Sequence, residues 1–246
     1  MKLKINCPKC NEENQGEEFQ EEIVKLKSIP RDFTIRFKCK NNHLNIIHLS
    51  DPLFSILFDK SVIAFVEENY RGCIFESASS LERFYEHAIR VLLIEQKDFE
   101  NKEIVESFNN AWRIIHKMSE RQIGAFIMLF NKTTNRIPIL LSNTLTNLRN
   151  DVIHKGYLPE KNEALKFLEN VYSLIQTNRQ IIANTNQDLY WLLDQRIDYE
   201  NFINPPELKP EEYTSMSYSG AHFFNSAFGG DTFEEAIKKY YDYKLA

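Results

Sequence analysis

Three cysteines and a histidine near the N-terminus constrain the fold of this chain more than any other feature. Cys7 and Cys10 form a C-x2-C pair, and after 28 intervening residues Cys39 and His43 form a C-x3-H pair. Two tight turns that each offer two ligands complete a tetrahedron when a hairpin brings them together, which is the arrangement of structural Zn²⁺ sites. Strand-like runs flank both pairs, so residues 1–50 are predicted to form a small zinc-ribbon-like β module.

The fourth ligand has two candidates. We prefer His43, because His48 lies inside a strand-like run. Four protein ligands leave no open position for water, so Zn²⁺ is expected to be structural and not catalytic. A zinc deaminase would need a glutamate two residues after a histidine, and neither histidine has one. The alternative is a C-x2-C pair with an unrelated cysteine and histidine nearby.

Two other features lie in the N-terminal half of the chain. The acidic segment at residues 11–22 is either a solvated loop or a docking surface for a protein. Cys73, far from the other three cysteines, is predicted to be a small buried core residue.

The charge balance limits the classes of partner. The net charge of -5 argues against general adhesion to nucleic acid or to anionic membranes, so contact with RNA would need a local basic patch. No stretch resembles a signal peptide or a membrane span, so we expect a cytoplasmic protein without a membrane partner. None of the seven glycines forms a phosphate-binding loop, which argues against nucleotide-driven chemistry.

From residue 51 onward, the apolar residues follow helical spacing. A first helix is predicted to start at Asp51-Pro52, and after a corner at residues 70–72 a long amphipathic helix follows. Later helices are predicted at 102–116, 119–131, 138–154 and 160–194. Ser119 and Gln122 match a capping box at the start of one of these helices. Residues 51–195 are therefore predicted to form an all-α bundle, so the fold class is mostly α.

The C-terminal segment, residues 196–246, differs from the bundle. Its prolines, glycines and aromatic residues predict an irregular aromatic-rich arm that ends in a short helix at 231–243. Exposing so many aromatic side chains would be costly. The arm is expected to pack either on its own bundle or on a neighbouring subunit.

The sequence RNDVIH, in which Arg149 and His154 are separated by four residues, is the strongest candidate for a catalytic site. Arg36 and His43 have a similar spacing but lie in the N-terminal β module. Arg149 differs because it lies near a predicted helix end and is followed by the polar residue Asn150. Residues 108–156 are also the basic region of this acidic protein, with seven Lys or Arg against two acidic residues.

This region resembles the HEPN superfamily, all-α proteins many of which are metal-independent ribonucleases with an Arg-x(4–6)-His motif and a polar residue after the arginine. The resemblance covers roughly residues 51–195 and implies that Arg149 and His154 are the catalytic pair, with Asn150 in support. A zinc module ahead of such a bundle looks like the ring-activated zinc-finger ribonucleases of bacterial anti-phage defence. That likeness implies a toxin-like effector, triggered by a partner such as a phage structural protein.

The chemistry of RNA cleavage without a metal suits these residue types. The 2'-hydroxyl attacks the adjacent phosphate, so a base and an acid are needed, and histidine can serve as either near neutral pH. A guanidinium stabilises the phosphate charge that grows in the transition state. No cofactor for catalysis is expected.

Helix geometry adds a requirement for the pair. Residues five apart on a straight helix point about 140° away from each other. Either a bend near Gly156 or a second copy of the chain must therefore bring the motif residues together. A homodimer or a higher homo-oligomer such as a ring is expected, and the HEPN resemblance implies the same. The alternative is a catalytically inactive HEPN-type interaction or sensor protein, in which the helix C-terminus simply favours the two cationic side chains.

Overall fold

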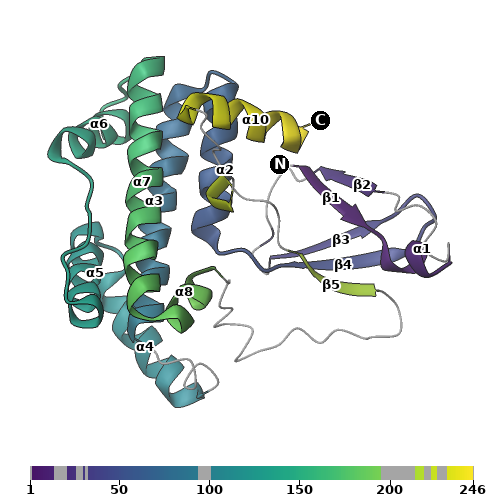
Figure 1. Ribbon diagram of the computed structural model, residues 1–246, viewed down its shortest axis with the longest axis horizontal. Helices are drawn as coiled ribbons and strands as arrows, with labels where there is room; N and C mark the ends of the chain where they lie inside the picture. The colour runs from purple at the N-terminus through teal and green to yellow at the C-terminus, as the bar shows by residue number, and fades with distance from the viewer. Residues whose placement is uncertain are drawn as a thin grey trace.

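The computed structural model has a helical body and a small β module beside it (Figure 1). It describes residues 2–13, 21–25, 30, 33–93, 101–194, 214–218, 223–225 and 232–245. The prediction of a mostly α fold with a small N-terminal β portion is confirmed at this level. Most of the acidic segment at 11–22, for which a solvated loop and a docking surface were both open, lies outside the described residues, as does the first part of the C-terminal arm.

The β module is built from two antiparallel pairs. Strand β1 (Lys2–Asn6) pairs with β2 (Glu21–Lys25), and β3 (Thr34–Lys38) pairs with β4 (Leu44–Leu49). The short helix α1 (Pro8–Glu13) follows β1. The buried core of the module includes one residue from the first helix of the body, so the module packs directly on that body; this core consists of Ile5, Ile35, Ile47, Leu49 and Ile56.

A strand from the C-terminal arm completes the second sheet. Strand β5 (Thr214–Tyr218) pairs in parallel with β4, with Asn45 opposite Thr214 and Leu49 opposite Tyr218. The prediction of an irregular arm is wrong for this segment. Its backbone hydrogen bonds are made with β4, a parallel partner distant in sequence, so no local sequence pattern indicates the strand. The N-terminal and C-terminal parts of the chain therefore share one sheet (Figure 1).

The centre of the helical body is formed by α2 (Leu53–Val66), α3 (Tyr70–Leu93) and α7 (Lys161–Thr185). The apolar side of α3 is buried along its length, as its sequence pattern predicts. Figure 1 shows α3 and α7 side by side in the middle of the body. The core there is rich in fully buried aromatic rings: Phe54, Phe58, Phe84, Phe126, Phe130, Phe167 and Phe223.

The remaining helices lie around this centre. They are α4 (Lys102–Ile115), α5 (Ser119–Thr134), α6 (Asn143–His154) and α8 (Gln187–Asp194). The helix predicted at 160–194 is in fact two helices, α7 and α8, separated at Asn186. Cys73 is fully buried, and burial raises the pKa of its thiol to about 12, so its predicted core role is confirmed.

The predicted capping box at α5 is wrong. Met118 is the N-cap residue of this helix and makes no side-chain cap bond. The Gln122 side chain instead donates from Nε2 to the backbone oxygen of His116, at 2.6 Å. A capping box does occur at the start of α7, where Glu160 and Glu163 bond reciprocally to backbone N–H groups.

The C-terminal helix α10 (Phe233–Leu245) lies across α2 (Figure 1). The hydroxyl of Tyr240 donates to Oδ2 of the buried Asp59, and the short 3₁₀ helix η2 (Phe223–Asn225) donates the Phe223 N–H to Oδ1 of the same carboxylate, at 2.9 Å. The arm was expected to pack either on its own bundle or on a neighbouring subunit, and α10 packs on its own bundle. No helix among the described residues is both long and apolar enough to cross a membrane.

Candidate functional site

The four predicted metal ligands lie together at the end of the β module. Their ligand atoms are all within 4.8 Å of one another. Sγ of Cys10 is 3.6 Å from Sγ of Cys39. Nδ1 of His43 is 3.7 Å from Sγ of Cys7 and 3.3 Å from Sγ of Cys10. A tetrahedral site with metal–sulfur bonds of about 2.3 Å has edges of about 3.8 Å, so this cluster can hold a metal ion with little movement.

Local turns present these ligands on one side. Cys7 and Cys10 lie at the junction of β1 and α1, where the Asn11 N–H donates to the Cys7 carbonyl. In the turn between β3 and β4, the Cys39 N–H donates to the His43 carbonyl at 3.1 Å. Asn42 supplies the left-handed conformation, with φ of 65°, that this turn requires. The two ligand pairs are therefore held by backbone hydrogen bonds on both sides of the cluster.

Outer groups orient the histidine and the thiols. Nε2 of His43 lies 3.4 Å from the Glu13 carboxylate, which leaves Nδ1 as the ligand atom. Burial raises the pKa of the Cys7 thiol, but hydrogen bonds from the Cys10 backbone, Asn45 and His43 lower it overall to about 7. This favours the thiolate form of Cys7, which is the form that binds a metal. Burial and the hydrogen bonds with Cys39 and Cys7 raise the pKa of the Cys10 thiol to about 11.

His48 lies outside the metal cluster. Its Nδ1 atom is 3.2 Å from Oγ1 of Thr34, across the β3–β4 pair. The choice of His43 over His48 is therefore confirmed for the cluster. Arg36, whose spacing to His43 imitates the ribonuclease motif, is exposed on β3. That pair is consequently part of the β module, and only the α6 pair remains as a candidate.

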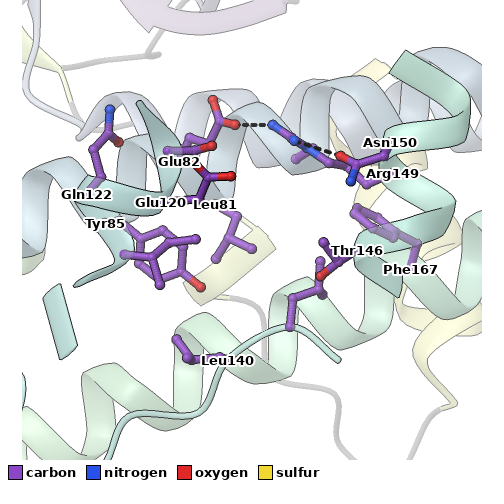
Figure 2. Close-up of a pocket in the computed structure, with 14 residues that line it drawn as sticks. Leu81, Glu82, Tyr85, Glu120, Gln122, Leu140, Thr146, Arg149, Asn150 and Phe167 are labelled. Atoms are coloured by element: carbon purple, nitrogen blue, oxygen red, sulfur yellow. Dashed lines mark hydrogen bonds and ion pairs between the residues drawn. The ribbon is translucent and has the colours of Figure 1, made fainter. Parts of the chain in front are cut away.

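Arg149 lies on α6, where two neighbours fix its guanidinium. Nη1 donates to Oδ1 of Asn150 at 3.0 Å, and Nη2 forms an ion pair with Glu82 of α3 (Figure 2). The Arg149 side chain is 23% exposed. Glu82 was not predicted as a site residue, although it lies on the polar side of the long helix that the sequence does predict. The contact joins two residues that are 67 positions apart, so no local sequence pattern indicates it.

A pocket of about 240 Å³ opens beside Arg149, between α3, α5 and α6. Its polar lining includes Glu82, Glu120, Gln122 and Asn150. Apolar side chains from several elements form the rest of its wall, among them Leu81, Tyr85, Ile123, Leu140, Leu141 and Phe167. The basic and acidic groups therefore face a partly apolar hollow that is able to hold a small ring.

His154 does not line this pocket. It is the last residue of α6 and is exposed. Because α6 continues unbroken from Arg149 to His154, the two side chains leave the helix about 140° apart. Gly156, with φ of 73°, turns the chain only after His154, so the bend considered as one way to bring the pair together does not do so. One copy of the chain assembles Arg149, Asn150 and Glu82, but not His154.

Exposed basic side chains also occur along the part of the chain that holds the motif. In and between α4, α5 and α6 they are Arg113, Lys117, Arg121, Lys132, Arg136 and Lys155. Lys155 forms an ion pair with Asp151 at 2.7 Å.

Comparisons with protein-family models, with curated proteins and with solved structures find no match for this chain. A function for this protein must therefore be inferred from the residues of the site.

Proposed function

We propose that this protein is a metal-independent endoribonuclease of the HEPN type, with an active site that a second copy of the chain completes. The main support is the position of Arg149, oriented by Asn150 and Glu82 at the edge of a pocket. The exposed His154 at the end of the same helix adds to it. An exposed histidine is free to enter the cleft of a neighbouring subunit.

The roles of these residues follow from the chemistry of the 2'-hydroxyl attack. A guanidinium carries five N–H donors, and the bonds to Asn150 and Glu82 leave others for a phosphate oxygen. Arg149 stabilises the growing phosphate charge, and Asn150 keeps its plane in place. His154 of the neighbouring copy takes the 2'-proton or protonates the leaving oxygen. The exposed basic side chains of residues 108–156 attract the RNA backbone.

The metal centre has a structural role in this proposal. Three thiolates and one imidazole favour Zn²⁺ over hard cations, which prefer oxygen ligands. A module of about 50 residues has a small core and gains stability from such a site. Metal analysis of a Cys7→Ser/Cys10→Ser double variant is expected to show near-complete loss of zinc. Stoichiometric zinc in this variant would contradict the ligand set.

A ribonuclease that acts on cellular RNA needs control. In this proposal the protein is a toxin-like effector of anti-phage defence that stays inactive until a partner, such as a phage structural protein, triggers it. The shared β3–β4–β5 sheet supports a role for the N-terminal module in this control, because the sheet joins that module to the C-terminal arm.

One observation favours a second candidate, an inactive HEPN-type interaction or sensor protein. The ion pair with Glu82 neutralises Arg149 and links α6 to α3. In that case Arg149 stabilises the packing of two helices, and His154 is a surface residue at a helix end.

Two alanine variants separate these candidates. Arg149→Ala and His154→Ala are each expected to lower the cleavage of RNA by at least about 100-fold. Arg71→Ala, outside the basic region, and His116→Ala are the controls, because both side chains are exposed and neither belongs to the motif. Cleavage is measured on total RNA and on a labelled oligonucleotide, with the products tested for a 2',3'-cyclic phosphate. If both motif variants cleave like the parent, the ribonuclease proposal is lost.

A further inference from the structure

Exposed apolar side chains lie at both ends of helix α6. Among the residues that the structure describes, the two most exposed large apolar side chains are Ile137, at 77%, and Leu158, at 74%. Ile137 comes before the start of α6 at Asn143, and Leu158 comes after its end at His154. Scattered exposed apolar residues are normal on a protein surface. These two, however, lie on either side of the helix that carries the motif.

The loop that carries Leu158 is held in place on both sides. The Tyr157 N–H donates to the Asp151 carbonyl at 3.1 Å, and the Tyr157 hydroxyl donates to the Glu163 carboxylate at 3.0 Å. Pro159, on the other side of Leu158, is buried. A fixed backbone therefore presents Leu158 to solvent, so burying this side chain against a partner costs little conformational entropy.

The pocket beside Arg149 offers an apolar surface of suitable size. Its volume of about 240 Å³ is the room of roughly eight water molecules at about 30 Å³ each, so a branched side chain of four carbons fits. The accessible part of its apolar wall includes the exposed Leu140 (Figure 2) and the half-buried Leu141 and Ile123. An apolar side chain that enters the pocket can therefore reach these residues.

Antiparallel pairing of two α6 helices brings the loop of one copy to the pocket of the other. In such a pair, a step forward along one helix corresponds to a step back along its partner. When His154 of the partner subunit lies opposite Arg149, Leu158 of the partner subunit lies four residues further on, at the level of Leu145. Thr146, next to Leu145, lines the pocket. The pairing that completes the motif therefore also places Leu158 at the pocket.

The charges on the two surfaces are complementary. The exposed Glu120 carboxylate lines the pocket, and the exposed His154 and Lys155 come just before Leu158. Lys155 pairs with Asp151 at the surface, but such exposed ion pairs contribute little and can be exchanged. Opposite charges around an apolar anchor favour the encounter of two specific surfaces. Charge and shape together therefore favour a second copy of this chain as the occupant of the pocket.

We propose that Leu158 is the anchor by which two copies of this chain form the active dimer, and that it inserts into the partner's pocket beside Arg149. Each copy gives its own Leu158 and receives that of the other, so the contact occurs twice about one two-fold axis. Arg149, at the edge of the pocket, remains available to RNA. The inference rests on the proposed function, since it names the surface that brings His154 to Arg149.

An alanine variant tests the anchor by analytical ultracentrifugation. Burying one leucine side chain is worth at least about a factor of 10 in an equilibrium constant. A two-fold dimer has two such contacts, so Leu158→Ala is expected to raise its dissociation constant by about 100-fold. Met128, which is 69% exposed on α5 and does not line the pocket, gives the matched control. Met128→Ala is expected to change the constant by less than about 2-fold.

Cysteine pairs locate the contact directly. A Leu158→Cys chain mixed with a Leu140→Cys chain is expected to form a cross-linked dimer with a short bismaleimide, because Leu140 lines the pocket that receives Leu158. The mixture of Leu158→Cys with Met128→Cys is the control and is expected to give at least about 10-fold less product. All three positions are exposed, so these substitutions do not threaten the fold. A parent that is monomeric in the cleavage assay, an unchanged dissociation constant for Leu158→Ala, or equal cross-linking in the two mixtures would overturn the proposal.

This inference and the proposed function can fail separately. Leu158→Ala keeps both motif residues, so its RNA cleavage is expected to recover as the protein concentration rises, whereas that of His154→Ala is not. Cleavage that depends on Arg149 and His154, together with normal dimerisation of Leu158→Ala, removes the anchor and leaves the ribonuclease. A dimer that depends on Leu158 but does not cleave RNA, even with its trigger, removes the ribonuclease and leaves the interface.

Discussion

The imidazole of His43 is held from two sides, by the cysteine sulfurs at Nδ1 and by the Glu13 carboxylate at Nε2. Such outer carboxylates orient a ligand and raise its basicity. Glu13→Gln is therefore expected to weaken zinc binding by about 10- to 100-fold without abolishing it. Competition with a chromogenic chelator measures the affinity. Glu12→Gln, at the exposed position next to it, is the control, and equal affinities for the two variants would contradict this role of Glu13.

His87 gives the molecule a dependence on pH. It lies on α3, and its Nε2–H donates to the Leu192 carbonyl of α8 at 3.2 Å, with the ring of Phe54 beside it. Burial lowers the pKa of His87 from 6.5 to about 4, and the charges of Arg90 and Arg179 act in the same direction. Between these two values the unfolded chain binds a proton that the folded chain does not. Stability is therefore lost as the pH falls from 6.5 toward 4.

The variant His87→Gln isolates this effect, because glutamine keeps an N–H donor and does not titrate. Each pKa unit corresponds to about 1.4 kcal/mol, so the parent is expected to lose about 1–3 kcal/mol more than the variant over this range. Urea unfolding at several pH values between 7 and 4 measures the difference. Parallel stability curves for the two proteins would show that His87 is not the responsible group.

At the scale of elements, the docking of α10 depends on one buried carboxylate. Asp59 of α2 accepts from the Tyr240 hydroxyl and from the Phe223 N–H, so it binds two segments of the C-terminal arm at once. Tyr240→Phe removes one donor from a buried charge and is expected to lower the free energy of unfolding by about 1.5–3 kcal/mol. Urea unfolding measures this change. Tyr241→Phe, next to it on the same helix, is expected to change stability by less than about 0.5 kcal/mol.

Local sequence patterns predicted the helices well and their ends less well. The helix predicted at 102–116 is observed at Lys102–Ile115. The one predicted from 138 begins only at Asn143, because the buried Asn178 side chain binds both backbone groups of Ile139 and so takes the place of helical hydrogen bonds there. These hydrogen bonds join residues 39 positions apart, so no local sequence pattern predicts them. Strand β5 was missed for a similar reason, since its partner β4 lies near the other end of the chain.

In the candidate site, too, local patterns could be predicted and contacts between distant residues could not. The metal cluster was predictable, because four ligand types at fixed spacing leave few alternatives. Arg149 and Asn150 were selected from a short motif, and they do lie together beside a pocket. Glu82 and Gln122 come from other helices, so they join the lining of the pocket only because α5 and α6 both pack on α3.

At the scale of the whole molecule, one chain does not bring the two motif residues together. Arg149 lines the pocket, whereas His154 is exposed at the end of the same unbroken helix. A two-fold dimer that pairs the α6 helices places His154 of one copy near Arg149 of the other, and it does so twice. A site built in this way has a property that a site within one chain lacks, because two inactive subunits can together form one active pair.

Mixing the two inactive variants tests this arrangement. In a mixed dimer of Arg149→Ala with His154→Ala subunits, one site loses both residues and the other keeps both. Random exchange makes half of the dimers mixed, so the mixture is expected to recover about a quarter of the parent activity. RNA cleavage is measured after exchange, and differently tagged subunits confirm that mixed dimers form. Mixing Arg149→Ala with the Arg149→Ala/His154→Ala double variant is the control, because no complete pair can form. If mixed dimers are present and cleavage stays at the level of either variant alone, Arg149 and His154 do not act across the dimer.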